Sequence, residues 1–153
     1  MSDTIRELII QDFLTRAAVI RTGSPSDYRT DIGAQVERCR KNPPTNCVNV
    51  WPHPEVASKT YGKQQHIMPI LLEGNLAFGD ENPSIVSERI LGDLIKAFTD
   101  PAWSRSPDYI GGIDYVSGGT GAYPDDEDHT VGASAQFNVH YETNIGDPYS
   151  QGG

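Results

Sequence analysis

The chain has 153 residues, of which 37% are hydrophobic and 22% charged, and its formal net charge is −9. This length predicts one domain that can bury a hydrophobic core. The apolar runs are far shorter than the ~20 residues of a membrane span, and the first twelve residues lack the pattern of a secretory signal. The negative charge argues against binding to nucleic acid or membrane surfaces through bulk charge.

Charge is divided unevenly along the chain. Residues 1–76 carry nine basic and eight acidic side chains, whereas residues 77–153 carry three basic and thirteen acidic ones. Such asymmetry is usual for solvated faces. It also suits a surface that meets a basic partner or keeps polyanions away. Both interpretations stay open at this point.

The N-terminal segment predicts a helix, with Ser2 as its cap and Gly23 beyond its end. Apolar side chains recur at helical spacing from Ile5 to Ile20. Extended segments are expected over 33–40 and 47–51, separated by a Pro-Pro loop.

The two cysteines, Cys39 and Cys47, lie eight residues apart around that loop. If 36–40 and 47–51 form a hairpin, the thiols face each other across it. The alternative is a pair of half-buried apolar side chains. In the absence of a secretory signal we expect no disulfide, and two cysteines make no zinc site.

The middle of the chain predicts a loop followed by a strand. Residues 53–65 show no apolar period and are expected to form a long loop. Residues 66–78 alternate, with Met68 and Leu72 on one face. Because Pro69 has no amide proton, this strand is expected at a sheet edge or with Pro69 facing away from its neighbour.

A second helix is predicted from Asn82, its cap, to the residue before Asp100. Its apolar stripe consists of Ile85, Val86, Ile90, Leu91, Leu94, Ile95 and Phe98. A short strand over 110–117 and a glycine turn over 118–121 follow. The last strand alternates cleanly, and its core-facing set is Val131, Ala133, Ala135, Phe137, Val139 and Tyr141.

This order of elements predicts an α+β fold, with a mainly antiparallel sheet of four to five strands and two helices packed on one face. The single domain is expected to span residues 1–143. Residues 144–153 are expected to form an extended C-terminal tail.

The sequence has none of the short motifs of nucleotide binding, zinc proteases or nucleophile elbows. Its densest polar cluster is Asp125, Asp126, Glu127, Asp128 and His129. The cluster is open to three interpretations: a solvated loop, a weak cation or partner contact, or a metal site, although adjacent acids rarely converge on one ion. The histidines, which also include His53, His66 and His140, share no ligand spacing. We therefore expect no catalytic residue, metal or cofactor.

Several segments carry a family resemblance: residues 28–33 leading into 36–40, then 74–77, 80–91, 137–143 and 146–149. Together they resemble the tail terminator (tail completion or minor tail) proteins of long-tailed bacteriophages, over nearly the whole chain. The resemblance implies a structural α+β subunit, not an enzyme. Such subunits form a hexameric ring that ends polymerisation of the tail tube and provides the head-joining surface.

The resemblance also implies the partners and the location. The partners are further copies of this chain, the tail tube protein and the head–tail connector or neck protein, while genomic DNA passes through the ring without specific binding. The location is the tail–neck junction of the virion, after assembly in the host cytoplasm, without a membrane. An acidic loop facing the channel would let DNA slide. The interface candidates are Arg38, Arg40, Lys41, His53, Lys59, Tyr61, Lys63, Asp125, Asp126, Glu127, Asp128, Asp147 and Tyr149.

Two alternatives remain. One is a small metal-dependent enzyme that uses His129, His140 and the acidic run 125–128. The other is a different neck or tube subunit.

Overall fold

The structure is a computed structural model that describes residues 3–23, 27–104, 107–121, 123–124 and 128–152. In this part of the chain, no helix is both long and apolar enough to cross a membrane. The elements in chain order are α1 (Ile5–Ala17), the 3-10 turn η1 (Ile32–Ala34), β1 (Gln35–Arg38), β2 (Cys47–Pro52), β3 (Val56–Thr60), β4 (Lys63–Ala77), α2 (Pro83–Thr99), α3 (Pro101–Ser104), β5 (Gly112–Gly119), β6 (Thr130–Asn144) and β7 (Asp147–Gln151).

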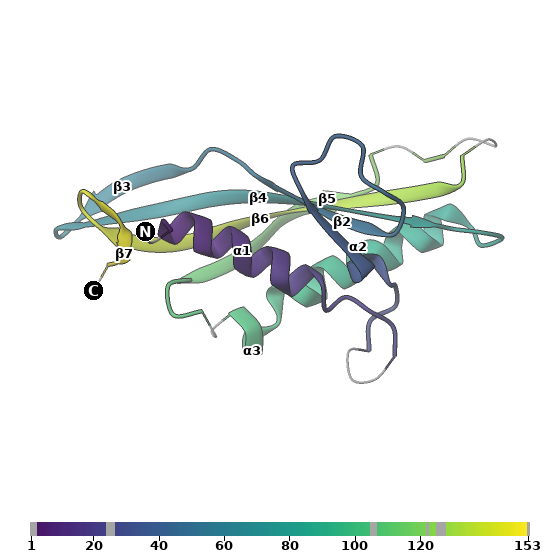
Figure 1. Ribbon diagram of the computed structural model, residues 1–153, viewed down its shortest axis with the longest axis horizontal. Coiled ribbons are helices and arrows are strands. Elements are labelled where there is room, and N and C mark those ends of the chain that lie inside the picture. The colour runs from purple at the N-terminus through teal and green to yellow at the C-terminus, as the bar shows by residue number, and fades with distance from the viewer. Residues whose placement is uncertain (1–2, 24–26, 105–106, 122, 125–127, 153) are drawn as a thin grey trace.

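All the strands belong to one seven-stranded sheet in the order β1-β2-β4-β6-β5, with β3 paired to β4 and β7 paired to β6. The two long helices lie on the same face of the sheet (Figure 1). The strands β4 and β6 pair along their whole length and give the domain its elongated shape (Figure 1). The α+β prediction is confirmed. The predicted number of four to five strands is too low, and β1 pairs with β2 in parallel, so the sheet is mixed.

The core lies between the helices and the β4–β6 pair. Every core-facing side chain predicted on the last strand is buried, as are Met68 and Leu72 of β4. Phe98 of α2 joins the layers, because its ring centroid lies 4.9 Å from that of Phe13 in α1 and 5.8 Å from that of Phe137 in β6. The apolar face of the alternating strand and the apolar stripe of the helix thus pack against each other, as the sequence predicts.

The ends of the helices follow ordinary capping chemistry. The cap of α2 is Asn82, as predicted, and its side chain accepts a hydrogen bond from the Ser84 amide at 2.9 Å. The cap of α1 is Thr4 rather than Ser2, since the Thr4 hydroxyl accepts from the Glu7 amide at 3.0 Å. Ile85, predicted in the apolar stripe, is 53% exposed, and the buried residues of α2 begin at Val86.

The hairpin that was one possibility for the two cysteine-bearing segments does not form. Since β1 and β2 run parallel, the segment 39–46 must cross back over the sheet instead of turning tightly. Asn49 anchors this crossing: its side chain accepts from the Arg40 amide and donates to the Arg40 carbonyl. Cys39 is therefore exposed, Cys47 is buried, and both are free thiols.

The loop predicted over 53–65 is also wrong, because β3 and the start of β4 form a hairpin there. The side chains of β3 are exposed, so the strand has no apolar period to detect. Pro69 lies in the central strand β4, where its carbonyl accepts from the His53 amide at 2.9 Å. Its nitrogen faces the same side, at the gap between β2 and β3, which is the second of the two predicted arrangements.

Two glycine-rich segments are more regular than expected. Gly118 and Gly119, predicted in a turn, belong to β5. The predicted C-terminal tail folds back, and its residues 147–151 form β7 on β6.

Gly33 is a sharp test of how tightly the chain packs around η1. A Cβ atom there would lie 2.4 Å from the Ala17 carbonyl oxygen and 2.8 Å from that of Ile20, and both belong to the backbone. We expect Gly33→Ala to lower the free energy of unfolding by about 1–3 kcal/mol, through overpacking. The measurement is urea unfolding followed by circular dichroism.

The control for this prediction is Gly92→Ala. Gly92 lies in α2, where nothing lies within 4 Å of the added Cβ, so alanine should raise stability by about 0.5–1 kcal/mol. A Gly33→Ala protein as stable as the wild type would contradict the packing described for η1.

Candidate functional site

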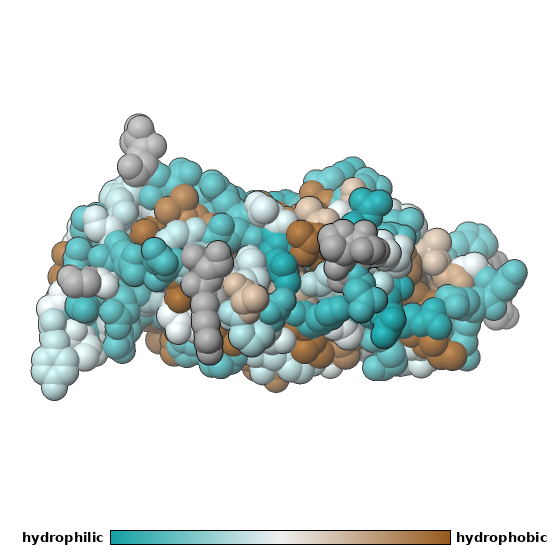
Figure 2. Space-filling view, turned by 90° about the horizontal axis from the view of Figure 1, so that it is seen from below, coloured by the Kyte–Doolittle hydropathy of each residue, from teal (hydrophilic) through white to brown (hydrophobic). Residues whose placement is uncertain are grey.

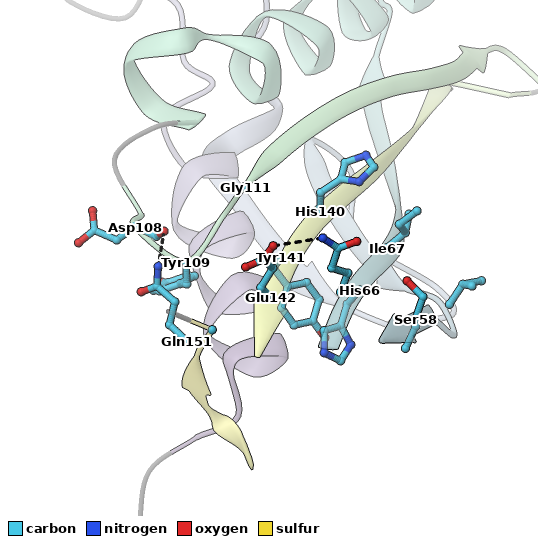
Figure 3. A pocket seen from close by; sticks show the side chains of 14 residues that line it. Ser58, His66, Ile67, Asp108, Tyr109, Gly111, His140, Tyr141, Glu142 and Gln151 are labelled. Carbon is cyan, nitrogen blue, oxygen red and sulfur yellow. Dashed lines mark hydrogen bonds between the residues drawn. The ribbon is translucent and has the colours of Figure 1, made fainter. Parts of the chain in front are cut away.

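Glu55 is the centre of a partly buried polar cluster. It lies in the connection between β2 and β3, and its carboxylate accepts from Arg6 of α1 at 2.9 Å and from the Tyr141 hydroxyl of β6 at 2.5 Å. Its second oxygen bonds Nδ1 of His66 in β4. The rings of His66 and Tyr141 stack with centroids 4.4 Å apart, and Figure 3 shows them side by side.

The cluster fixes the protonation of its members. Burial raises the pKa of Glu55, but the hydrogen bonds from Tyr141, His66 and Arg6 outweigh it, and the pKa lies below its ordinary value. Burial, and next the bond to the carboxylate, raises the pKa of the Tyr141 phenol. Near neutral pH Glu55 is therefore charged and Tyr141 keeps its proton.

The Glu55 cluster contains the residue types of a nucleophile triad, because Nε2 of His66 lies 2.8 Å from the Thr143 hydroxyl. A hydroxyl nucleophile must reach its substrate, but Thr143 is only 3% exposed. Glu55 is also shared with Arg6 and Tyr141. We therefore interpret the cluster as structural: it ties α1, the β3–β4 hairpin and β6 together. Nothing in the sequence spacing indicated it, since its residues come from four distant segments.

A cavity of about 390 Å³ lies beside this cluster, between β3, β4, β6 and the segment 108–111 (Figure 3). Two pairs of its lining residues are joined by hydrogen bonds. Gln65 donates to Glu142 at 3.3 Å, and Gln151 donates to the Asp108 carbonyl at 3.0 Å. These four residues therefore bond in two separate pairs.

The predicted interface residues near β1 form internal ion pairs or lie in loops. Arg38 makes two hydrogen bonds to Glu7, at 2.7 and 2.8 Å, and Arg40 pairs with Glu37 at 2.8 Å. Lys41 and His53 are exposed. Because β1 lies at one edge of the sheet, the candidates in and just after it do not form one surface with the remaining predicted interface residues.

Five of the predicted interface residues gather at one end of the domain, namely Lys59, Tyr61, Lys63, Asp147 and Tyr149. The β3–β4 and β6–β7 turns lie side by side, because Lys63 pairs with Asn144. We define the hairpin end as Lys59, Tyr61, Lys63, Ile145 and Tyr149, and Asp147 lies beside it in β7. Tyr61 is 99% exposed, Ile145 46% and Tyr149 54%. Ile145 is not among the predicted interface residues, although its place next to the turn glycine Gly146 indicates an exposed apolar side chain.

The opposite end carries carboxylates. The β4–α2 turn lies beside the residues before β6, since the Phe78 amide donates to the His129 carbonyl at 3.2 Å. We define the acidic end as Asp80, Glu81, Ile85, Glu88 and Asp128. In Figure 2 this end, at the right, is mostly hydrophilic. Three further candidates, Asp125, Asp126 and Glu127, lie outside the described residues.

The metal-site alternative does not fit the sheet. His129 directly precedes β6 and His140 lies near its far end, so at about 3.3 Å per residue they are roughly 35 Å apart and cannot bind one ion. His140 instead pairs with Asp114 at 2.8 Å. Among the described residues, no group of three or more His, Cys, Asp or Glu side chains could hold a metal.

The Glu55 cluster predicts a pH dependence of stability. Because its folded-state pKa is lowered from 4.5, ionised Glu55 stabilises the fold above that value, and the contribution is lost as the pH falls through the folded pKa. We expect Glu55→Gln to cost about 1–3 kcal/mol near pH 7 and to weaken the loss of stability below about pH 5. Urea unfolding across pH measures both, with exposed Glu73→Gln as the control. An unchanged pH profile would sink the assignment.

The sequence was also compared with known proteins. No family model matches this chain, and no curated protein matches it.

Proposed function

We propose that this protein is a tail terminator of a long-tailed bacteriophage. It forms a hexameric ring on the head-proximal end of the tail tube, ends tube polymerisation and presents the surface that joins the head. The carrying observation is that the two ends of this elongated α+β domain differ (Figure 1). The exposed side chains of Tyr61, Ile145 and Tyr149 lie at the hairpin end, whereas the exposed carboxylates of Asp80, Glu81 and Glu88 lie at the acidic end. In the polar cluster at Glu55, by contrast, the hydroxyl next to His66 belongs to Thr143, which is only 3% exposed.

Two different ends suit a ring. Contact between unlike patches of identical subunits is head-to-tail, and it closes into a ring when the rotation per subunit allows. The hairpin end carries Lys59 and Lys63, and the acidic end carries Asp80 and Glu88. Complementary charge favours this pairing over contact between like ends.

The acidic half of the chain fits the passage of DNA. Residues 77–153 carry thirteen of the 21 acidic side chains. A channel surface built from this half repels the phosphate backbone, so that DNA moves through the ring without binding. The partners are then the tail tube protein, the connector or neck protein and further copies of this chain, at the tail–neck junction of the virion after assembly in the host cytoplasm.

The test is the length of growing tubes. The purified protein is added to polymerising tail-tube subunits of the cognate phage, and tube lengths are measured by electron microscopy. We expect the mean length to fall as the protein concentration rises, with gold label at one end of each tube. Unchanged lengths exclude termination, and label along the tubes identifies a tube subunit instead.

A further inference from the structure

The segment 39–46, which we call the strap, crosses the face of the sheet that the long helices leave uncovered. Figure 1 shows it on the side of the sheet opposite α1 and α2. Every residue of the strap is exposed or half-buried. A segment with few buried apolar contacts gains little from the hydrophobic core, and such segments open at a lower free energy than the whole domain.

The strap is fastened to the sheet through side-chain amides. Asn49 of β2 accepts from the Arg40 amide at 3.2 Å and donates to the Arg40 carbonyl at 2.6 Å, and Asn75 of β4 donates to the Pro44 carbonyl at 3.0 Å. Two longer bonds, both of 3.3 Å, join Gln35 to the Thr45 carbonyl and the Ala77 amide to Asn46. Among the described residues, no backbone amide or carbonyl of 40–46 bonds another backbone group. The strap is therefore not part of the ladder of the sheet.

Both ends of the strap lie in the left-handed region of the backbone. The angle φ is 53° at Cys39 and 59° at Asn46. This region is unfavourable for residues with a side chain, although asparagine tolerates it better than cysteine does. In the middle of the strap, Pro43 and Pro44 each have a fixed φ. Rotation at the two strained ends would thus move a stiff middle part as a unit.

The thiol of Cys47 lies beneath the strap. Cys47 is 0% exposed, but it is not part of the core cluster that contains Val48 and Val50. Because successive side chains of a strand point to opposite faces, Cys47 shares the outer face with Asn49. It also lies directly opposite Asn75 in the register of β2 and β4. Cys47 is therefore placed between the two amides that fasten the strap, and the closed strap covers it.

We propose that the strap opens as a unit while the rest of the domain stays folded, and that its opening uncovers Cys47 and the outer face of β2. The ends at Cys39 and Asn46 act as hinges, where opening relieves the backbone strain. The closed strap shields this part of the sheet and the open strap presents it, so the segment controls access to the outer face. The inference does not depend on the proposed ring, because all of these contacts lie within one subunit.

The first test measures access to Cys47 with the thiol reagent DTNB. Cys39→Ser leaves Cys47 as the single thiol of the chain. Without denaturant, we expect labelling at least about tenfold faster than global unfolding of the same protein permits. The rate should change little at low urea, since a local opening exposes little surface. Labelling that is no faster than global unfolding permits, at every urea concentration, overturns the proposal.

The matched control is Val48→Cys in a chain that also carries Cys39→Ser and Cys47→Ala. Val48 is next to Cys47 in β2 and is equally 0% exposed, but it faces the core. Its thiol should be labelled only at the rate that global unfolding of that variant sets, with a steep dependence on urea. Equal protection of the two thiols, each compared with the global stability of its own variant, contradicts a local opening.

The second test changes the strain at one hinge. Glycine adopts a φ of 53° without steric cost, so Cys39→Gly favours the closed strap. Compared with Cys39→Ser, we expect it to slow the labelling of Cys47 about three- to tenfold. Both variants lack the exposed thiol, so the comparison isolates the backbone effect. An equal or faster rate in Cys39→Gly overturns the proposal.

The third test removes one fastening. In the Cys39→Ser chain, Asn75→Ala deletes the bond to Pro44 and should accelerate the labelling of Cys47 about tenfold, after correction for the global stability of the variant. The control is Asn138→Ala, because Asn138 lies further along the same face, opposite Pro69, and its loss should leave the corrected rate unchanged. An unchanged rate in Asn75→Ala, or an equal acceleration in Asn138→Ala, overturns the proposal.

Discussion

The fold depends on burial of the apolar face of β4 and β6 beneath α1 and α2. These two fifteen-residue strands pair in full, and Phe98 packs between the helices and the sheet they cover. Removal of a buried phenylalanine typically costs about 3–5 kcal/mol, whereas an exposed ion pair contributes about 0–1 kcal/mol. The core therefore determines the shape, and pairs such as Arg38–Glu7 adjust it only slightly.

The polar cluster around Glu55 fixes the part of the long sheet that the helices do not cover. Beyond the helices the β3–β4 hairpin has little apolar surface to bury, since the side chains of β3 are exposed. Arg6, His66 and Tyr141 hold the hairpin base by hydrogen bonds instead. A charge in this setting is tolerated because several donors share it. The hairpin thereby keeps a defined position although its tip contacts solvent.

The two ends of the domain differ in chemistry because one sheet separates them. Along β4, Lys63 begins at the hairpin end and Ala77 ends next to the acidic turn. Contact between unlike ends of identical subunits is head-to-tail, which is the kind of contact that the proposed ring needs.

The sequence by itself determined the elements that have a strong period. The alternation of β6 and the stripe of α2 were predicted to within a residue or two, because these elements bury one face and Asn82 supplies an ordinary cap. It did not reveal β3, since a strand exposed on both faces has no period, nor the parallel pairing of β1 and β2, which the crossing of segment 39–46 decides. Only the tertiary structure could bring Arg6, Glu55, His66 and Tyr141 together, because hydrogen bonds between distant segments leave no pattern in local spacing. The same holds for the two ends: their residues were visible as polar side chains, but the register of β4 against β6 decided which of them became neighbours.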